Sequence, residues 1–98
     1  GADGVIDVAN CRRVTAASGS STTNTKSVQP QCTAGTEFMQ VYGHTTSAGA
    51  GQVVLDSAAL ILNGNYAIGV DIQVSELAAD GVGDPDWELT AEIICCLK

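Results

Sequence analysis

The chain has 98 residues, of which 11 are acidic and 4 are basic, and its formal net charge is −7. This length fits one domain with a single small core, and we expect that domain to span residues 1–98. The sparse positive charge argues against nucleic acid or an anionic membrane as a partner, and no stretch reaches the roughly 20 apolar residues that a membrane span requires.

The cysteines predict disulfides rather than a metal site. The chain has 4 Cys and 1 His but no Cys-x-x-Cys pair of the kind that zinc sites use. Disulfides supplement the modest cores of small secreted domains, so we expect an extracellular or cell-surface protein without a cofactor. The chain starts Gly1-Ala2-Asp3, with neither an initiator methionine nor an apolar leader, as expected of a processed chain or one released from a tag.

The first third of the chain predicts a strand, a polar loop and a turn. Residues 4–16 are rich in β-branched residues with polar ones between them, which is typical of an edge strand. Residues 17–27 are a run of small polar side chains with nothing to bury, so we expect an exposed loop or a very polar strand. Pro30 and Gly35 then indicate a turn within residues 28–36.

The middle of the chain predicts more strands. Residues 37–44 and 52–55 have strand character, with a loop of small residues at 45–51. The apolar run 58–62 fits a buried strand or a helical turn, because periodicity cannot separate the two at this length. Asn63-Gly64-Asn65 predicts a tight hairpin turn, and the alternation over residues 66–75 gives the clearest strand. Residues 76–86 are expected to form a loop.

The closing stretch, residues 87–98, predicts a half-buried strand with two cysteines on opposite faces. Its apolar side chains alternate with polar ones, apart from Ile94. Neighbouring side chains of a strand point to opposite faces, so Cys95 should face the core and Cys96 should face outward and be free at the surface. The core face of this strand would hold Trp87, Leu89, Ala91, Ile93, Cys95 and Leu97.

Six or seven short strands with turn signals about every ten residues predict an all-β fold. The expected architecture is an antiparallel β-sandwich, jelly-roll or immunoglobulin-like, stapled by disulfides.

Two segments carry a resemblance to a known kind of domain. The run Gln31-Cys32-Thr33-Ala34-Gly35-Thr36 is followed by Trp87-x-Leu89-x-Ala91-x-Ile93-x-Cys95. Together they resemble a small secreted bacterial β-sandwich domain, in which a Cys-Pro-Ala-Gly motif opens a strand and a Trp-x-Val-x-Val-x-Ala-x-Cys strand closes the chain. Thr33 stands here in place of the proline, and the glycine-rich run after the first motif is reduced to residues 41–44.

The resemblance implies a disulfide between Cys32 and Cys95 and a module without enzymatic activity. With that pair taken, Cys11 and Cys96 remain for a second bridge, either within one chain or between neighbouring chains. A link between chains would be head-to-tail and would propagate unless it closed a ring. A vicinal Cys95–Cys96 disulfide is the least favoured of the alternatives.

Other candidate site residues have ordinary structural explanations. His44 lacks the neighbours that a general base needs, and Ser18, Ser20 and Ser21 lack the Gly-x-Ser-x-Gly elbow of a hydrolase. The remaining candidates are a weak calcium site and an aromatic platform for sugars, with Tyr66 and Trp87 expected on core faces instead. The calcium site would use Asp80, Asp84 and Asp86, and the platform would use Tyr42, Tyr66 and Trp87.

These observations favour a secreted, non-enzymatic structural protein that assembles with copies of itself into an extracellular filament or surface layer. Edge-strand pairing, beginning with the N-terminal strand, is the expected mode of assembly. The alternative is a monomeric module that binds glycan or protein ligands through the loops at 17–27 and 76–86.

Overall fold

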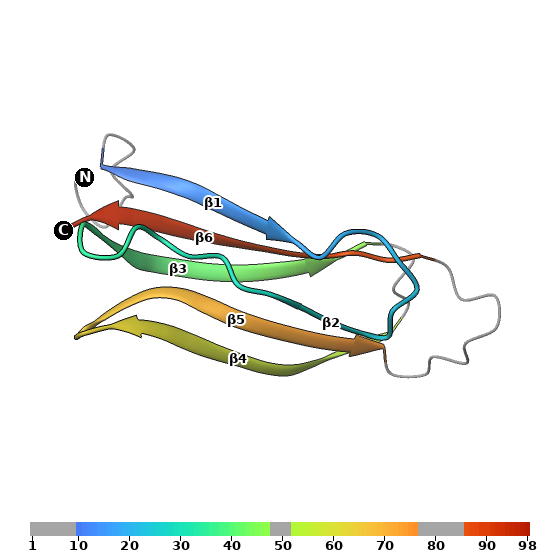
Figure 1. The fold of residues 1–98 in the computed structure, drawn as a ribbon. Helices are drawn as coiled ribbons and strands as arrows, with labels where there is room; N and C mark the ends of the chain where they lie inside the picture. Colours follow the sequence, from blue (N-terminus) through green and yellow to red (C-terminus); the bar gives the residue numbers. More distant parts are fainter. Residues whose placement is uncertain (1–9, 48–51, 77–85) are drawn as a thin grey trace.

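A computed structural model describes residues 10–47, 52–76 and 86–98. Within these ranges the protein is all-β, with two three-stranded antiparallel sheets stapled by two disulfides. Figure 1 shows the sheets as two layers, one above the other. The strands are β1 (Cys11–Ala17), β2 (Thr25–Val28), β3 (Glu37–Thr46), β4 (Val53–Asn63), β5 (Tyr66–Glu76) and β6 (Leu89–Leu97).

The strand order places β6 and β5 at the centre of their sheets. One sheet has the order β1-β6-β3 and the other has the order β2-β5-β4. Across the two layers, β3 packs opposite β5 and β2 packs opposite β6, while the main contacts of β4 are with β5 in its own sheet. The layers are therefore staggered by about one strand, so that β4 extends beyond β3.

The core lies between the two central strands and confirms most of their alternation. Leu97, expected on the core face, is 52% exposed at the end of β6. The buried side chains of β5 are Ile68, Val70, Ile72 and Val74, and those of β6 are Leu89, Ala91, Ile93 and Cys95. Trp87 is fully buried just before β6, and its indole Nε1 donates a hydrogen bond of 2.9 Å to the Thr23 carbonyl oxygen. The polar segment 18–24 thus closes over the core by satisfying the one polar atom of the Trp87 ring.

Several predicted elements have different boundaries in the structure. The described part of the first strand begins at Cys11, and residues 4–9 lie outside the described ranges; β1 is an edge strand, as predicted. Residues 53–55 of the run 52–55 and the whole run 58–62 lie in one continuous strand, β4, because the bulge at Asp56 restores the pairing with β5. The helical alternative for 58–62 is therefore wrong. The predicted polar loop at 17–27 ends earlier than expected, since β2 starts at Thr25.

The hairpin between β4 and β5 forms where Asn63-Gly64-Asn65 predicts it. Gly64 has a φ angle of 62°, which glycine adopts without strain. Tyr66 is 45% exposed, so its expected position on the core face is wrong. It lies at the hairpin end, beyond a bulge that disrupts the alternation between Tyr66 and Val70. Within the described ranges, no helix is both long and apolar enough to cross a membrane.

Candidate functional site

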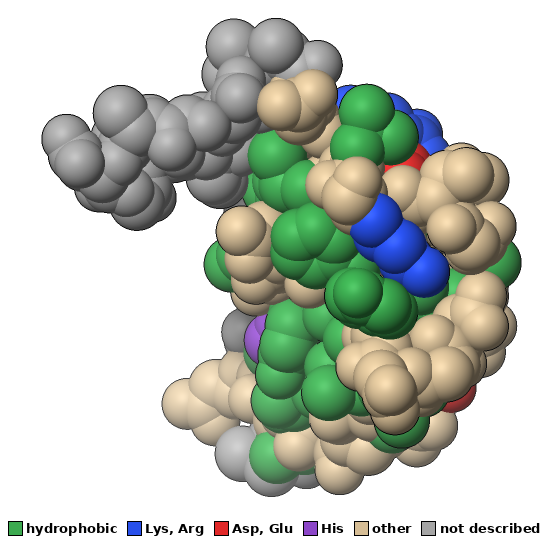
Figure 2. All heavy atoms as spheres, turned by 90° about the vertical axis from the view of Figure 1, so that its left-hand side faces the viewer, with side chains coloured by type: hydrophobic (Ala, Val, Ile, Leu, Met, Phe, Trp, Pro, Cys, Tyr) green, Lys and Arg blue, Asp and Glu red, His purple; other side chains and the backbone are tan. Residues whose placement is uncertain are grey.

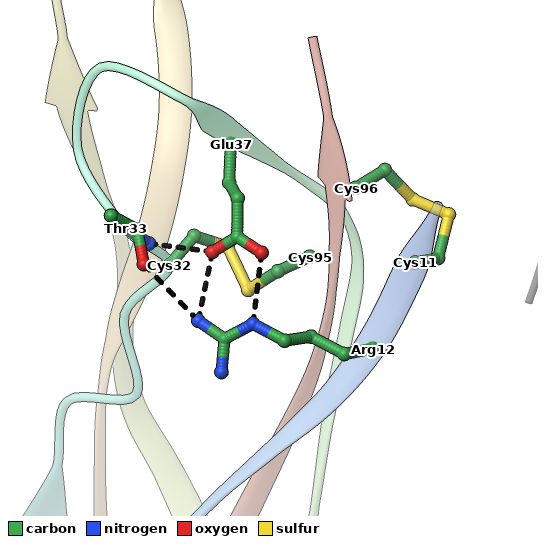
Figure 3. Close-up of a disulfide and its surroundings, with 7 residues drawn as sticks. All are labelled: Cys11, Arg12, Cys32, Thr33, Glu37, Cys95 and Cys96. Carbon is green, nitrogen blue, oxygen red and sulfur yellow. Dashed lines mark hydrogen bonds and ion pairs between the residues drawn. A yellow bond between two sulfur atoms is a disulfide. The ribbon is translucent and has the colours of Figure 1, made fainter. Parts of the chain in front are cut away.

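The two disulfides lie together at one end of the layers (Figure 3). Cys32 bonds to Cys95 and Cys11 bonds to Cys96. Cys95 is fully buried in the core, and Cys96 lies on the other face of β6, directly opposite Cys11 of β1. The expectation of a Cys96 free at the surface is wrong, because the bond to Cys11 covers it and leaves it 4% exposed. The second bridge is thus the one within a single chain.

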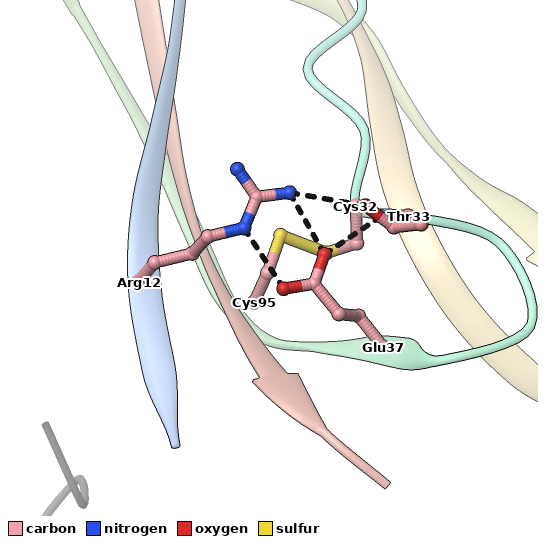
Figure 4. A network of polar contacts seen from close by, with 5 residues as sticks. All are labelled: Arg12, Cys32, Thr33, Glu37 and Cys95. Carbon is pink, nitrogen blue, oxygen red and sulfur yellow. Dashed lines mark hydrogen bonds and ion pairs between the residues drawn. A yellow bond between two sulfur atoms is a disulfide. The ribbon is translucent and has the colours of Figure 1, made fainter. Parts of the chain in front are cut away.

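A buried carboxylate completes this stapled end (Figure 4). Glu37, at the start of β3, accepts two hydrogen bonds of 2.8 Å from Nε and Nη2 of Arg12. It accepts a third, also of 2.8 Å, from the backbone N–H of Thr33. A two-point guanidinium–carboxylate contact fixes both distance and orientation. The network therefore ties β1, the turn after Cys32 and the start of β3 to one another beside the Cys32–Cys95 bond.

The same contacts set the protonation state of Glu37. Hydrogen bonds from Arg12 and then from Thr33 lower the pKa of the Glu37 carboxyl from 4.5 to about 2, since they favour its charged form. The Sγ atoms of Cys32 and Cys95 and a carboxylate oxygen of Glu37 lie within 4.8 Å of one another. A metal would need free thiolates, but these sulfurs are bonded to each other and the carboxylate is engaged by Arg12. We therefore interpret the cluster as a structural staple.

The flank formed by β3 and β4 is apolar and is left open by the other described residues. β3 pairs with β6 along one edge and β4 pairs with β5 along one edge, and neither has a second strand partner among the described residues. Side chains that a core would normally bury are exposed here, including Tyr42 at 44%, Leu55 at 46% and Leu60 at 52%. Hydrophobic side chains also gather on the end of the molecule shown in Figure 2. Exposed apolar surface of this kind is typical of interaction sites.

The stagger of the layers explains why β4 is exposed. Leu55, Ala58 and Leu60 lie opposite Val74, Ile72 and Val70 in the β4–β5 register. Residues directly opposite each other in a pair of strands share a face, so these three side chains project from the core face of the sheet. Since β3 already lies over β5, the layer above ends before it covers them. A further strand beside β3 would lie above this face of β4.

A shallow groove of about 590 Å³ lies on the outer face of the β1-β6-β3 sheet. It is lined by residues 41–45 of β3, by Thr90 and residues 92–94 of β6, and by Arg13 of β1. Gly43 has no side chain to fill the groove, and an added Cβ there would meet no atom within 4 Å. Arg13 and Glu92 form an exposed ion pair of 4.0 Å across the floor. The groove thus presents both charges and hydroxyl groups to solvent.

The remaining predicted site residues do not converge on one place. His44 is exposed in β3, and Ser18 accepts a hydrogen bond of 3.0 Å from the Leu89 backbone N–H, which is a structural contact. Asp86 is exposed, while Asp80 and Asp84 lie outside the described ranges, so the weak metal candidate stays a prediction. The aromatic platform does not include Trp87, because that ring is buried and covered by Lys26, whose Nζ lies 4.9 Å from the ring centre.

Sequence reasoning missed the two features that distinguish this molecule. The Arg12–Glu37 pair joins residues that are 25 positions apart, and nothing in the local pattern signals it. The apolar face of β4 is visible in the sequence as Leu55 and the run 58–62, but its exposure depends on the stagger of the layers.

Comparison of the chain with known proteins identifies no similar protein. A scan against protein-family models finds no match, and neither curated protein sequences nor solved structures match the chain. The resemblance to a secreted bacterial domain stays a prediction.

Proposed function

We propose that this protein is a non-enzymatic structural subunit that assembles with copies of itself into an extracellular filament or surface layer. The proposal includes secretion and assigns the two packed sheets to the jelly-roll or immunoglobulin-like β-sandwiches. Two disulfides are the form that cysteines take in an oxidising compartment.

The observation that carries the proposal is the open flank, meaning the edge of β3 and the core face of β4 that no other described residues pair with or cover. Natural sheets protect exposed edges with charges, prolines, bulges or covering loops. β4 is 11 residues long, and its exposed apolar side chains are Val54, Leu55, Leu60 and Leu62. An unpaired edge of β3 next to this apolar face of β4 supports association through strand addition, which uses backbone hydrogen bonds for affinity.

Association in this proposal is noncovalent. Both cysteine pairs are closed within one chain, so the version in which Cys96 links neighbouring subunits is not part of it. Denaturing electrophoresis without reductant should therefore give a single band near 10.0 kDa, even from assembled material.

The test is the mass of the oxidised full chain in solution. Light scattering after gel filtration should give a mass that exceeds 10.0 kDa and rises with concentration, and electron microscopy of concentrated samples should show filaments or sheets. A mass that stays at one chain up to millimolar concentration would contradict the proposal.

A second candidate is a monomeric module that binds a glycan or protein ligand, and the groove along β3 favours it. The groove offers Arg13, Glu92 and the hydroxyl groups of Thr45 and Thr90, which are groups that fix a polar ligand. This candidate predicts a monomer that binds saturably on a glycan array. Loss of that binding on Gly43→Leu, which fills the groove, would support it over assembly.

A further inference from the structure

Among the residues that the structure describes, the open flank leaves room for one particular element, a single extended strand. A strand added beside β3 would continue the β1-β6-β3 sheet and would lie above Leu55, Ala58 and Leu60 of β4. Leu55 to Leu60 spans about 15 Å, and six extended residues reach about 20 Å. The space therefore suits a segment of about six residues with apolar side chains on one face only, because the other face would point to solvent.

We propose that residues 4–9 of a second copy of this chain supply that strand. The run reads Gly4-Val5-Ile6-Asp7-Val8-Ala9. In an extended conformation Ile6 and Val8 share one face, and Asp7 lies with Val5 on the other. The Ile6 face would cover β4, and the Asp7 face would stay in water. This proposal rests on the proposed function, since it names the segment through which the copies assemble.

The donor is a second copy because the chain's own residues cannot reach far enough. Residue 9 precedes Asn10, whose carbonyl oxygen accepts a hydrogen bond of 2.8 Å from the Leu97 N–H beside β1. The vacant position lies three strand spacings away, across β6 and β3, which is about 14 Å. About four extended residues are needed for that crossing. The crossing would take residues 6–9, so Ile6 and Val8 could not also lie over β4 of their own chain.

Donation between copies is head-to-tail, because the donated segment and the open flank are different surfaces. Such a contact produces a ring if its rotation closes and an open filament if it does not. Each subunit gives one segment and accepts one. A chain that cannot donate its segment, or cannot accept one, can therefore still take part in one contact. It cannot extend a filament.

This complementarity gives a sharp test with two variants of the full chain. The donor variant is I6D/V8D, and its matched control is V5D/A9D on the other face of the same segment. The acceptor variant is Leu55→Asp on the core face of β4, and its control is Val54→Asp, the neighbouring residue on the outer face. Val54 and Leu55 are 42% and 46% exposed, so both substitutions place a charge at similar accessibility. Far-ultraviolet circular dichroism and the absence of free thiols check folding.

The expected results concern mass under nondenaturing conditions. The donor and acceptor variants should each have the mass of one chain, whereas both controls should assemble as the unaltered chain does. An equimolar mixture of the two variants should form a species of twice that mass and stop there. If the unaltered chain assembles but both variants assemble equally well, the donated strand is wrong and the proposed function stands. If the unaltered chain is itself a monomer, the proposed function is wrong, and the donated strand is wrong with it.

Discussion

The two flanks of the β1-β6-β3 sheet are built in opposite ways. On one flank, β1 has seven residues, carries Arg12 and Arg13, and is bonded to β6 through Cys11. On the other flank, β3 has ten residues, with Val41 and Tyr42 exposed and the apolar face of β4 beside it. A short, charged, cross-linked edge resists pairing with another chain, and a longer edge beside an exposed apolar face favours it. An edge strand is therefore not by itself an interaction site.

This difference separates two parts of the sequence prediction for the first strand. The polar character of residues 4–16 correctly predicts an edge at β1, and the pairing of this strand with a neighbouring copy stays a prediction. The described part of this strand belongs to the protected flank. The open flank is formed by β3 and β4, and their exposure follows from the stagger of the two layers.

The largest effect on stability should come from breaking the stapled end. Cys95 and Cys96 are adjacent, so the two disulfides together close a loop of roughly 22 residues from Cys11 to Cys32. Removing either disulfide opens this loop, which should lower the free energy of unfolding by about 3 kcal/mol in the chain-entropy model. C32A/C95A should cost more than C11A/C96A, because the Cys95 sulfur is fully buried and its removal also leaves a cavity. Urea unfolding of both variants measures this difference. Equal losses would indicate that core packing at Cys95 adds nothing.

A smaller loss is expected where two backbones approach closely. An alanine Cβ at Gly69 in β5 would lie against the Pro30 carbonyl oxygen and 3.1 Å from the Gln31 Cα, so Gly69→Ala should cost about 1–3 kcal/mol through overpacking. Gly43→Ala on β3 is the control, since nothing lies within 4 Å of its added Cβ. Thermal unfolding should place the Gly43 variant close to the unaltered chain. An equally large loss at Gly43 would contradict the open space that the groove leaves beside this residue.

The Arg12–Glu37 pair should make the stapled end sensitive to acid. The pKa of Glu37 is lowered to about 2 in the folded chain, whereas an unfolded glutamate titrates near 4.3. The stabilisation is present above the unfolded pKa and is lost as pH falls toward 2. Glu37→Gln should therefore be less stable than the unaltered chain at pH 7, and this difference should shrink between pH 4.5 and pH 2. A difference that is constant with pH would show that the Glu37 charge contributes nothing.

The smallest effects on stability belong to the open flank. Leu55→Asp and Val54→Asp alter half-exposed side chains, and such surface changes stay within about 0.5 kcal/mol. Their unfolding curves, measured at concentrations where the chain is dispersed, should nearly coincide. A loss of several kcal/mol for Leu55→Asp would mean that this side chain belongs to the core of the single chain.

Much of the fold follows from local pattern, while the candidate site does not. The alternation around Val70 and Ile93 predicts the two central strands and their buried faces, and Asn63-Gly64 predicts the hairpin, because these signals arise within a few residues. Three observations depend instead on distant parts of the chain. Tyr66 is exposed because of a bulge and its place at the hairpin end, Cys96 is covered by Cys11, and Leu55 is exposed because the facing layer stops at β3. No window of sequence contains that information.

The two flanks of the sheet should differ in which one becomes covered when copies meet. Amide hydrogen exchange of β1 and β3, both edge strands, should be followed in dispersed and in concentrated protein. We predict that concentration slows exchange in residues 40–46 of β3 and leaves residues 12–17 of β1 unchanged. Slower exchange in β1 with no change in β3 would contradict the account.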